Sequence, residues 1–168
     1  MYLNAGGGST LFWAKRAARV TTVESSVDWF DFILQSTKDV PQDKINIIHA
    51  CDVNDYCKAM ALAKFDLLVI DGHWRAQCAE YAVNNLGYKG IILLDNSDWC
   101  PETCRFLERS GFCRLDYSGF GASNQFTWSS SLFFHNLESS LLRPKDLPSS
   151  LGYIAYDQAD YMFGGERK

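Results

Sequence analysis

The sequence predicts an α/β fold in which helices cover both faces of a doubly wound, mostly parallel β-sheet. Short apolar runs typical of strands alternate with segments of helical periodicity through most of the chain. Several of these runs, such as residues 65–70, are apolar almost throughout, as expected for strands with a helix on each side. With 168 residues, of which 47% are hydrophobic, the chain is long enough for one domain with a sizeable core.

The first element is the end of a strand at residues 2–5, which runs into three consecutive glycines. A helix is expected at 10–18, with Ser9 as its N-cap. The alternation then continues regularly, and Pro101 and Gly111 are placed as they often are at the start and just past the end of a helix. Further strands are predicted at 20–24, 45–50, 65–70 and 90–94, and further helices at 26–36, 55–63, 76–86 and 101–110.

The last part of the chain departs from this alternation. Two strand-like runs, 112–117 and 130–135, follow each other with no helical segment between them, which predicts an antiparallel hairpin at the edge of the sheet. From residue 137 onward the sequence contains Pro and Gly and shows no clear period. We therefore divide the chain into a folded domain at 1–136 and an irregular C-terminal extension at 137–168.

Charge and composition narrow the classes of function. The formal net charge of −4 argues against a nucleic-acid partner, which usually meets a basic surface. No apolar run approaches the roughly 20 residues that span a bilayer, so we expect no membrane partner. The start of the chain lacks the features of a signal peptide, and the six cysteines show no C-x-x-C spacing. We expect a cytoplasmic protein whose thiols are reduced.

The glycines of the first turn, together with Glu24, indicate a nucleotide-like ligand. Glycines between a strand and a helix let the backbone approach a ligand closely. Glu24 ends the second predicted strand, about 20 residues further on. At this position an acidic residue can accept hydrogen bonds from the hydroxyl groups of a ribose. A dinucleotide fingerprint, G-x-G-x-x-G, fails at Leu11, and the G-K-[ST] of a phosphate-binding loop is absent.

At this point the sequence resembles the class I S-adenosylmethionine-dependent methyltransferases, which have a Rossmann-like fold. The resemblance is carried by "NAGGGSTLFWAKRAARVTTVESSVDWF", "FDLLVIDGHWRAQCAEYAVNNLGYKGIILLDNSDW" and "GFCRLDYSGFGASNQFTWSSSLFFH", and it covers residues 2–136. It implies a seven-stranded sheet of order 3-2-1-4-5-7-6, with strand 7 antiparallel. The helices that usually precede the first strand in this family have no counterpart here, so we expect a fold that lacks them.

The resemblance also assigns the cofactor site. It implies that S-adenosylmethionine is bound with its ribose on Glu24, and that Asp52 and Val53, after the third strand, flank the adenine. Asp71 and Gly72, after the fourth strand, would line the side where the methyl group is transferred. The methionine part of the cofactor would be wrapped by the first turn, which consists of Ala5, Gly6, Gly7, Gly8 and Ser9.

Polar residues at two strand ends suggest where catalysis takes place. Asp71 ends one apolar run, and Asp95 and Asn96 end the next, so in neighbouring parallel strands their side chains would meet at one edge. Carboxylate and amide oxygens suit Mg²⁺, and this set resembles the metal site of catechol O-methyltransferase. The alternative is that these residues cap helices and accept backbone N–H groups, with no ion.

Two residues of the "DGHWR" stretch are further catalytic candidates besides Asp71. His73 is a candidate general base, because its ordinary pKa lies near neutrality; the alternative is a simple hydrogen-bonding role. Arg75 is a candidate clamp for a carboxylate or phosphate of the substrate, or else a solvated residue in the first turn of a helix. The segment 118–128 contains glycine and aromatic residues, and we expect it to be a loop beside the substrate.

The function that follows is a methyltransferase that uses S-adenosylmethionine, acting on an oxygen atom of a small-molecule methyl acceptor. Two alternatives stay open. Leu3 and Ala5 stand where the family usually has an acidic residue and a glycine, which would suit a non-catalytic or decayed methyltransferase fold acting as an interaction module. An NAD-dependent oxidoreductase is disfavoured by Leu11. Apolar surface left by the absent N-terminal helices would also favour a homo-oligomer.

Overall fold

A single seven-stranded sheet organises the chain. The computed structural model describes residues 1–4, 8–120 and 127–135. Within this part the strand order is β3-β2-β1-β4-β5-β7-β6, as predicted. The strands are β1 (Tyr2–Asn4), β2 (Val20–Glu24), β3 (Ile45–His49), β4 (Leu67–Ile70), β5 (Ile91–Leu94), β6 (Cys113–Phe120) and β7 (Thr127–Phe134).

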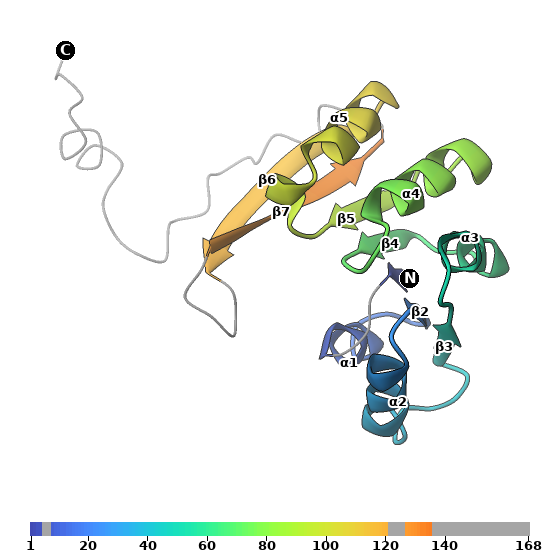
Figure 1. Cartoon of the computed structure of the whole chain (residues 1–168). Helices are drawn as coiled ribbons and strands as arrows, with labels where there is room; N and C mark the ends of the chain where they lie inside the picture. Colours follow the sequence, from blue (N-terminus) through green and yellow to red (C-terminus); the bar gives the residue numbers. More distant parts are fainter. Residues whose placement is uncertain (5–7, 121–126, 136–168) are drawn as a thin grey trace, which may run out of the picture. The chain divides into compact units, whose positions relative to one another are not determined.

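Helices pack on both faces of this sheet. Figure 1 shows α3, α4 and α5 following one another along one face, and α1 and α2 on the other. The predicted doubly wound arrangement is therefore confirmed for the described residues. The helical segments are α1 (Gly8–Ala14), α2 (Val27–Ser36), α3 (Val53–Lys58), η1 (Ala59–Leu62), α4 (Arg75–Glu80), η2 (Tyr81–Asn85), η3 (Ser97–Trp99) and α5 (Pro101–Arg109).

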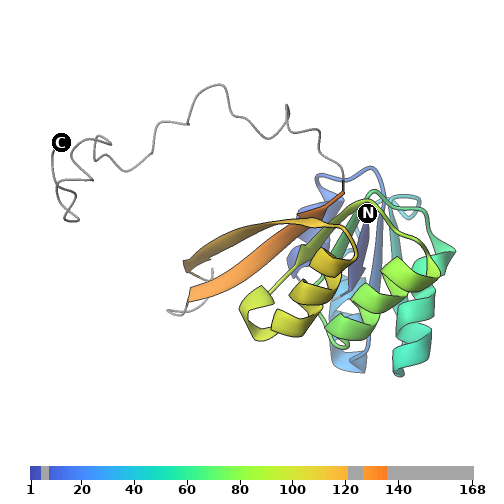
Figure 2. The ribbon, with the colours of Figure 1, turned by 90° about the horizontal axis from the view of Figure 1, so that it is seen from above.

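The pairing of the strands fixes which residues meet at each end. The first five strands, β1 to β5, pair in parallel, with Asn4 opposite Val23 on β2 and Ile70 on β4. β7 is antiparallel to both β5 and β6, which confirms the predicted closing hairpin. Figure 2 shows β6 and β7 as the long pair at one edge of the sheet. Because β1 to β5 are parallel, their carboxyl ends share one edge.

The main hydrophobic core lies between the sheet and the layer of α3, α4 and α5. It includes Tyr2, Ile70 and Leu94 from the strands, and Tyr56 and Leu107 from the helices, all at most 1% exposed. Every second residue of a strand points to the same face, so the alternating positions of β4 and β5 supply this core. No helix among the described residues is long and apolar enough to cross a membrane.

The first helix differs from its prediction at both ends. It begins at Gly8, so Ser9 lies within the helix and is not its N-cap. It ends at Ala14 instead of residue 18, because the backbone there turns: the N–H of Arg16 donates to the carbonyl of Trp13 at 2.9 Å. This early ending brings the chain back to β2 within a few residues.

The segment predicted as one helix at 76–86 changes geometry along its length. It starts as an α-helix at Arg75 and becomes a π-helix at Tyr81–Asn85, where the N–H of Leu86 donates to the carbonyl of Tyr81. A π-helix inserts a residue into a turn, which shifts the register of the side chains that follow. Hydrophobic periodicity alone does not reveal such a change.

The predicted extension at 137–168 lies outside the described residues, as do Ala5, Gly6 and Gly7 of the first turn. The division of the chain into 1–136 and 137–168 therefore stays a prediction.

Candidate functional site

Acidic side chains collect at the carboxyl edge of the parallel strands. Glu24 is the last residue of β2, Asp71 directly follows β4, and Asp95 directly follows β5. In doubly wound sheets ligands bind outside this edge, where the strand order reverses. Here the order reverses at β1, between β2 and β4, so Glu24 and Asp71 lie on either side of the reversal.

The carboxylate of Glu24 is held by the turn that follows its strand. The side chain is 9% exposed, and its Oε1 accepts hydrogen bonds from the N–H groups of Ser25 at 2.7 Å and Ser26 at 2.8 Å. Ser26 is also the N-cap of α2, accepting from the N–H of Trp29 at 3.4 Å. Glu24 therefore has a fixed orientation at the end of β2. This is the position where we expect the residue that binds the ribose.

Asp52 is held by backbone groups in a similar way. It is the N-cap of α3, and its Oδ1 accepts from the N–H of Asn54 at 2.9 Å and of Asp55 at 3.1 Å. These bonds, led by the one from Asp55, lower the pKa of this exposed carboxyl. Val53, the first residue of α3, is half-buried beside it. Asp52 and Val53 thus follow the carboxyl end of β3, and their assignment to the adenine stays a prediction.

The Asp71 and Asp95 carboxylates lie close together. Burial, followed by the charge and a hydrogen bond of Asp95, raises the pKa of Asp71 to about 6. Asp95 accepts a hydrogen bond from the hydroxyl of Ser130 on β7. The expected meeting of these two side chains is therefore observed, and Ser130 is a partner that sequence analysis did not find.

Arg75 is engaged with the ends of β4 and β5. Its Nε donates to the carbonyl of Gly72 at 3.0 Å and its Nη2 to the carbonyl of Asp71 at 2.9 Å. Its Nη1 donates to the carbonyl of Asp95. Its separation from the Asp71 carboxylate is 3.9 Å, between Nη2 and Oδ1. The guanidinium thus bridges two strand ends, and the expected clamp for a substrate anion stays a prediction.

Asn96 points its amide oxygen at the same guanidinium. Both Nη1 and Nη2 of Arg75 lie 3.2 Å from Asn96 Oδ1. Asn96 has a φ of 47°, a left-handed conformation that asparagine tolerates better than most residues. The described residues contain no group of three or more His, Cys, Asp or Glu side chains suited to hold a metal ion.

His73 lies on the Glu24 side of the site. Its Nδ1 is 2.8 Å from the hydroxyl of Ser25, and the ring is exposed, packing against Trp74 with centroids 5.6 Å apart. Trp74 itself has a φ of 52° and packs edge-on against Tyr56 of α3. His73 therefore lies beside the turn that follows β2 and holds Glu24.

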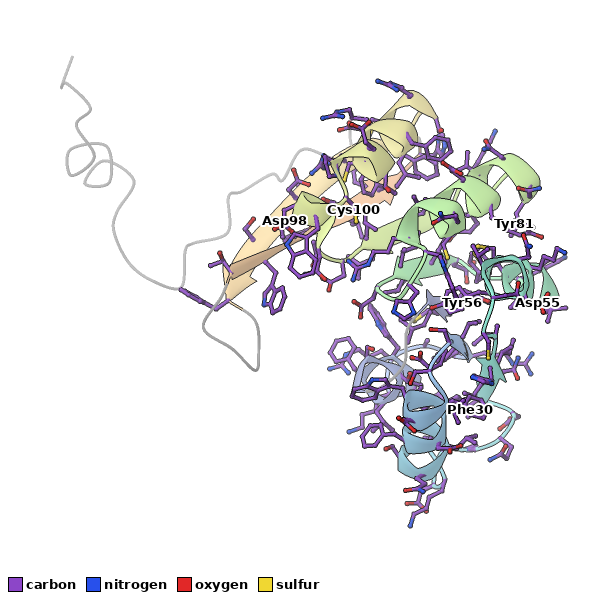
Figure 3. The ribbon with its side chains drawn as sticks, viewed as in Figure 1. Phe30, Asp55, Tyr56, Tyr81, Asp98 and Cys100 are labelled. Atoms are coloured by element: carbon purple, nitrogen blue, oxygen red, sulfur yellow. The ribbon has the colours of Figure 1, made fainter. Side chains whose placement is uncertain are left out.

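A cavity of about 810 Å³ opens beside the aspartate pair. Its walls come from the ends of β4 and β5, from α1, and from the hairpin of β6 and β7. Figure 3 labels Asp98, in η3 between β5 and α5, and Tyr56, on α3. The lining residues are Ser9, Asp71, Asp95, Asn96, Tyr117, Ser118, Gly119, Phe120, Trp128 and Ser130.

The predicted loop at 118–128 is in part a pair of strands. Residues 118–120 belong to β6 and 127–128 to β7, while 121–126 lie outside the described residues. The described ends of this segment do line the cavity. Tyr117 and Ser130 were missed, because only the register of the hairpin, which pairs them directly, reveals that they share its cavity side.

No family model matches this chain, and no curated protein matches it in sequence. Comparison of folds does find similar solved structures.

An O-methyltransferase from Bacillus cereus, in complex with S-adenosylhomocysteine, is 16% identical with a TM-score of 0.63, over 79% of this chain and 73% of that one. An rRNA methylase from Streptococcus thermophilus is 15% identical with a TM-score of 0.59, over 80% and 86%. A precorrin-6y C5,15-methyltransferase from Geobacter metallireducens is 14% identical with a TM-score of 0.56, over 80% and 78%.

These neighbours have the class I methyltransferase fold, and their identities are too low to show more than the fold. Their names refer to acceptors as different as a ribosomal RNA and a precorrin. The fold similarity therefore supports a methyltransferase architecture and leaves the substrate to be argued from this chain's own site.

Proposed function

We propose that this chain is an S-adenosylmethionine-dependent methyltransferase that transfers a methyl group to an oxygen atom of a small-molecule acceptor. One observation carries the proposal. In a sheet of methyltransferase order, a fixed carboxylate ends β2, and a close pair of carboxyl groups at the ends of β4 and β5 borders a cavity. The first feature suits a cofactor, and the second suits proton transfer at the acceptor.

The residues present fit the cofactor. Glu24, oriented by the N–H groups of Ser25 and Ser26, would accept hydrogen bonds from the ribose hydroxyls. Asp52 and Val53 border the place expected for the adenine. Ser9 on α1 and Asp71 after β4 line the cavity, where the methionine part would lie, and Gly72 directly follows Asp71. The cofactor supplies, when bound, a methyl group activated by a positively charged sulfur.

Asp71 is the residue that we assign as general base. Its pKa of about 6 makes it a stronger base than an ordinary aspartate, and it is still mostly ionised at neutral pH. It would take the proton of the acceptor hydroxyl as the oxygen attacks the methyl group. Asp95, held by a hydrogen bond from Ser130, lies beside it. His73 is the second candidate base, on the Ser25 side of the site.

The residues at the rim do not fit a divalent cation well. Asn96 Oδ1 accepts two N–H groups of Arg75, so its lone pairs face a positive charge and not an ion site. The same guanidinium, 3.9 Å from Asp71, would repel a cation bound there. The Mg²⁺ expectation thus finds no support in this donor set, and no step of the proposal passes through a metal.

An activity assay tests the proposal. The full chain is incubated with S-adenosylmethionine and a panel of small phenols, and S-adenosylhomocysteine and methylated products are measured by mass spectrometry, with and without EDTA. We expect both products in equal amounts, EDTA to have no effect, and Asp71→Asn to abolish turnover while His73→Gln retains it. Loss of activity in EDTA would support a metal-dependent reaction after all. Full activity in Asp71→Asn would assign the role of general base to His73.

A further inference from the structure

The walls of the cavity beside Asp71 and Asp95 combine two kinds of chemistry. Three of the lining residues, Tyr117, Phe120 and Trp128, are aromatic and form what we call the aromatic wall; two others, Asp71 and Asp95, carry carboxyl groups. The remaining lining residues are Ser, Asn and Gly. Among the described residues that line the cavity there is no Lys, Arg or His.

The two carboxyl groups differ in how their charge is offset. Asp71 lies 3.9 Å from Nη2 of Arg75, whose guanidinium also donates to the carbonyls of the strand ends and to Asn96. The Asp95 carboxylate accepts a hydrogen bond from Ser130 and forms no ion pair with any other described residue. An anionic ligand placed at Asp95 would therefore meet a carboxyl group with no cation paired to it, which is unfavourable in a partly buried site.

The aromatic wall is exposed to water. Phe120 is 79% exposed and Tyr117 is 54% exposed, while Trp128 packs against Trp99 with ring centroids 5.8 Å apart. A flat apolar ligand would remove this surface from water, and the electron-rich faces of the rings attract a positive charge. The wall and the carboxyl groups thus favour the same ligand, one with an aromatic ring and a cationic group.

We propose that the methyl acceptor is a small aromatic amine that binds as a cation, with its ring against Tyr117, Phe120 and Trp128 and its ammonium group at Asp95. This inference rests on the proposed function and specifies its substrate class. An ammonium group neutralises one of the two carboxylates. Asp71 is then left to accept the proton of the acceptor hydroxyl. One carboxyl group would thus bind the substrate, and the other would act as the base.

Four probes separate the two parts of the inference. Tyramine has a ring and a positive charge, 4-ethylphenol has the ring without charge, 4-hydroxyphenylacetate has the ring and a negative charge, and 2-cyclohexylethylamine has the charge without an aromatic ring. Each is titrated into the full chain by calorimetry at pH 7.5, without and with saturating S-adenosylhomocysteine. We expect tyramine to bind at least about tenfold tighter than the other three.

Variants assign the preference to the walls. Asp95→Asn should bring tyramine down to the affinity of 4-ethylphenol and leave 4-ethylphenol unchanged. Phe120→Leu should weaken tyramine and leave 2-cyclohexylethylamine unchanged; Phe120 is so exposed that folding should not suffer. The matched control is Glu102→Gln, which removes an equal charge from an exposed position on α5 that pairs only with Arg105 among the described residues.

The outcomes distinguish this inference from the proposed function. If S-adenosylhomocysteine binds but 4-ethylphenol or 4-hydroxyphenylacetate binds as tightly as tyramine, the cationic acceptor is wrong and the methyltransferase proposal stands. If tyramine preference appears only in the absence of S-adenosylhomocysteine, that molecule occupies the place assigned to the ammonium group of the acceptor, and the inference is overturned. If S-adenosylhomocysteine does not bind at all, the proposed function fails.

Discussion

Two aspartates on the same edge of the sheet have opposite electrostatic environments. Asp52, after β3, accepts two backbone N–H groups at the start of α3, and these bonds lower its pKa. Asp71, after β4, is half-buried beside Asp95, and its pKa is raised to about 6. Both follow an apolar strand, so the neighbouring groups and not the position in the fold set the difference.

This contrast divides the edge into two parts with different tasks. On the side of β2 and β3, Glu24 and Asp52 are oriented by backbone N–H groups, which fixes them as hydrogen-bond acceptors for a bound molecule. On the side of β4 and β5, Asp71 and Asp95 repel each other, which favours taking up a proton. We therefore assign binding of the cofactor to the first part and proton transfer to the second.

The largest effect is expected where Arg75 holds the second part together. Arg75→Ala removes the donors for the carbonyls of Asp71, Gly72 and Asp95 and takes away the charge that lowers the pKa of Asp71. We expect the free energy of unfolding to fall by about 2–4 kcal/mol, because partly buried carbonyls lose their partners. Urea denaturation measures this.

Arg105→Ala is the matched control, because its ion pair with Glu102 is exposed and such pairs contribute only about 0–1 kcal/mol. Equal losses in the two variants would mean that Arg75 does not hold the ends of β4 and β5.

Replacement of Asp71 should give a smaller effect, of opposite sign. Its pKa in the folded state, about 6, lies above its ordinary value of 3.8, so ionisation destabilises the fold. The free energy of unfolding of wild type should therefore fall relative to that of Asp71→Asn as the pH rises from about 4 to 6. Above pH 6 the difference between the two proteins should stay constant. After discounting for the partial exposure of the side chain we expect a gap of about 1–2 kcal/mol at pH 8.

The measurement is urea denaturation of both proteins at pH 4, 6 and 8. If Asp71→Asn is less stable than wild type at pH 8, the ionised Asp71 carboxylate does not destabilise the fold, and the assignment is contradicted.

Asp52→Ala tests the other aspartate of the comparison, and we expect it to have the smallest effect on stability. The pKa of Asp52 is lowered in the folded state, so its carboxylate stabilises the fold above the ordinary pKa, and this contribution is lost as the pH falls through the lower, folded-state value. We expect a modest decrease in Tm at pH 8, because α3 loses its N-cap. Thermal unfolding at pH 8 and pH 3 checks it: a Tm difference that grows on acidification would contradict the capping role.

Most of the fold was predictable because it depends on local patterns. Apolar runs marked the strands, and the absence of a helical segment before residues 130–135 revealed the antiparallel β7. Glu24, Asp71 and Asp95 were found because each ends a strand, and parallel strands bring such residues to one edge. Their position needed no knowledge of side-chain contacts.

What the sequence did not reveal depends on contacts across the sheet. The guanidinium of Arg75 donates to carbonyl and amide oxygens after β4 and β5, the furthest of them 21 residues away in the sequence. Nothing in "DGHWR" indicates that the guanidinium turns toward these oxygens. Ser130 reaches Asp95 only through the register of β7 against β5. The cofactor assignments to Ala5, Gly6 and Gly7 stay predictions, because these residues lie outside the described part of the chain.

Binding of S-adenosylhomocysteine tests the central claim most directly. Calorimetric titrations of S-adenosylhomocysteine and of NAD into the full chain are compared for wild type, Glu24→Ala and the control Glu80→Ala, which changes an exposed glutamate on α4. We predict that wild type binds S-adenosylhomocysteine and not NAD, and that Glu24→Ala alone weakens binding by about tenfold or more, which corresponds to about 1.4 kcal/mol. Wild type that binds NAD, or neither ligand, would contradict the account, and unchanged affinity in Glu24→Ala would remove the ribose assignment.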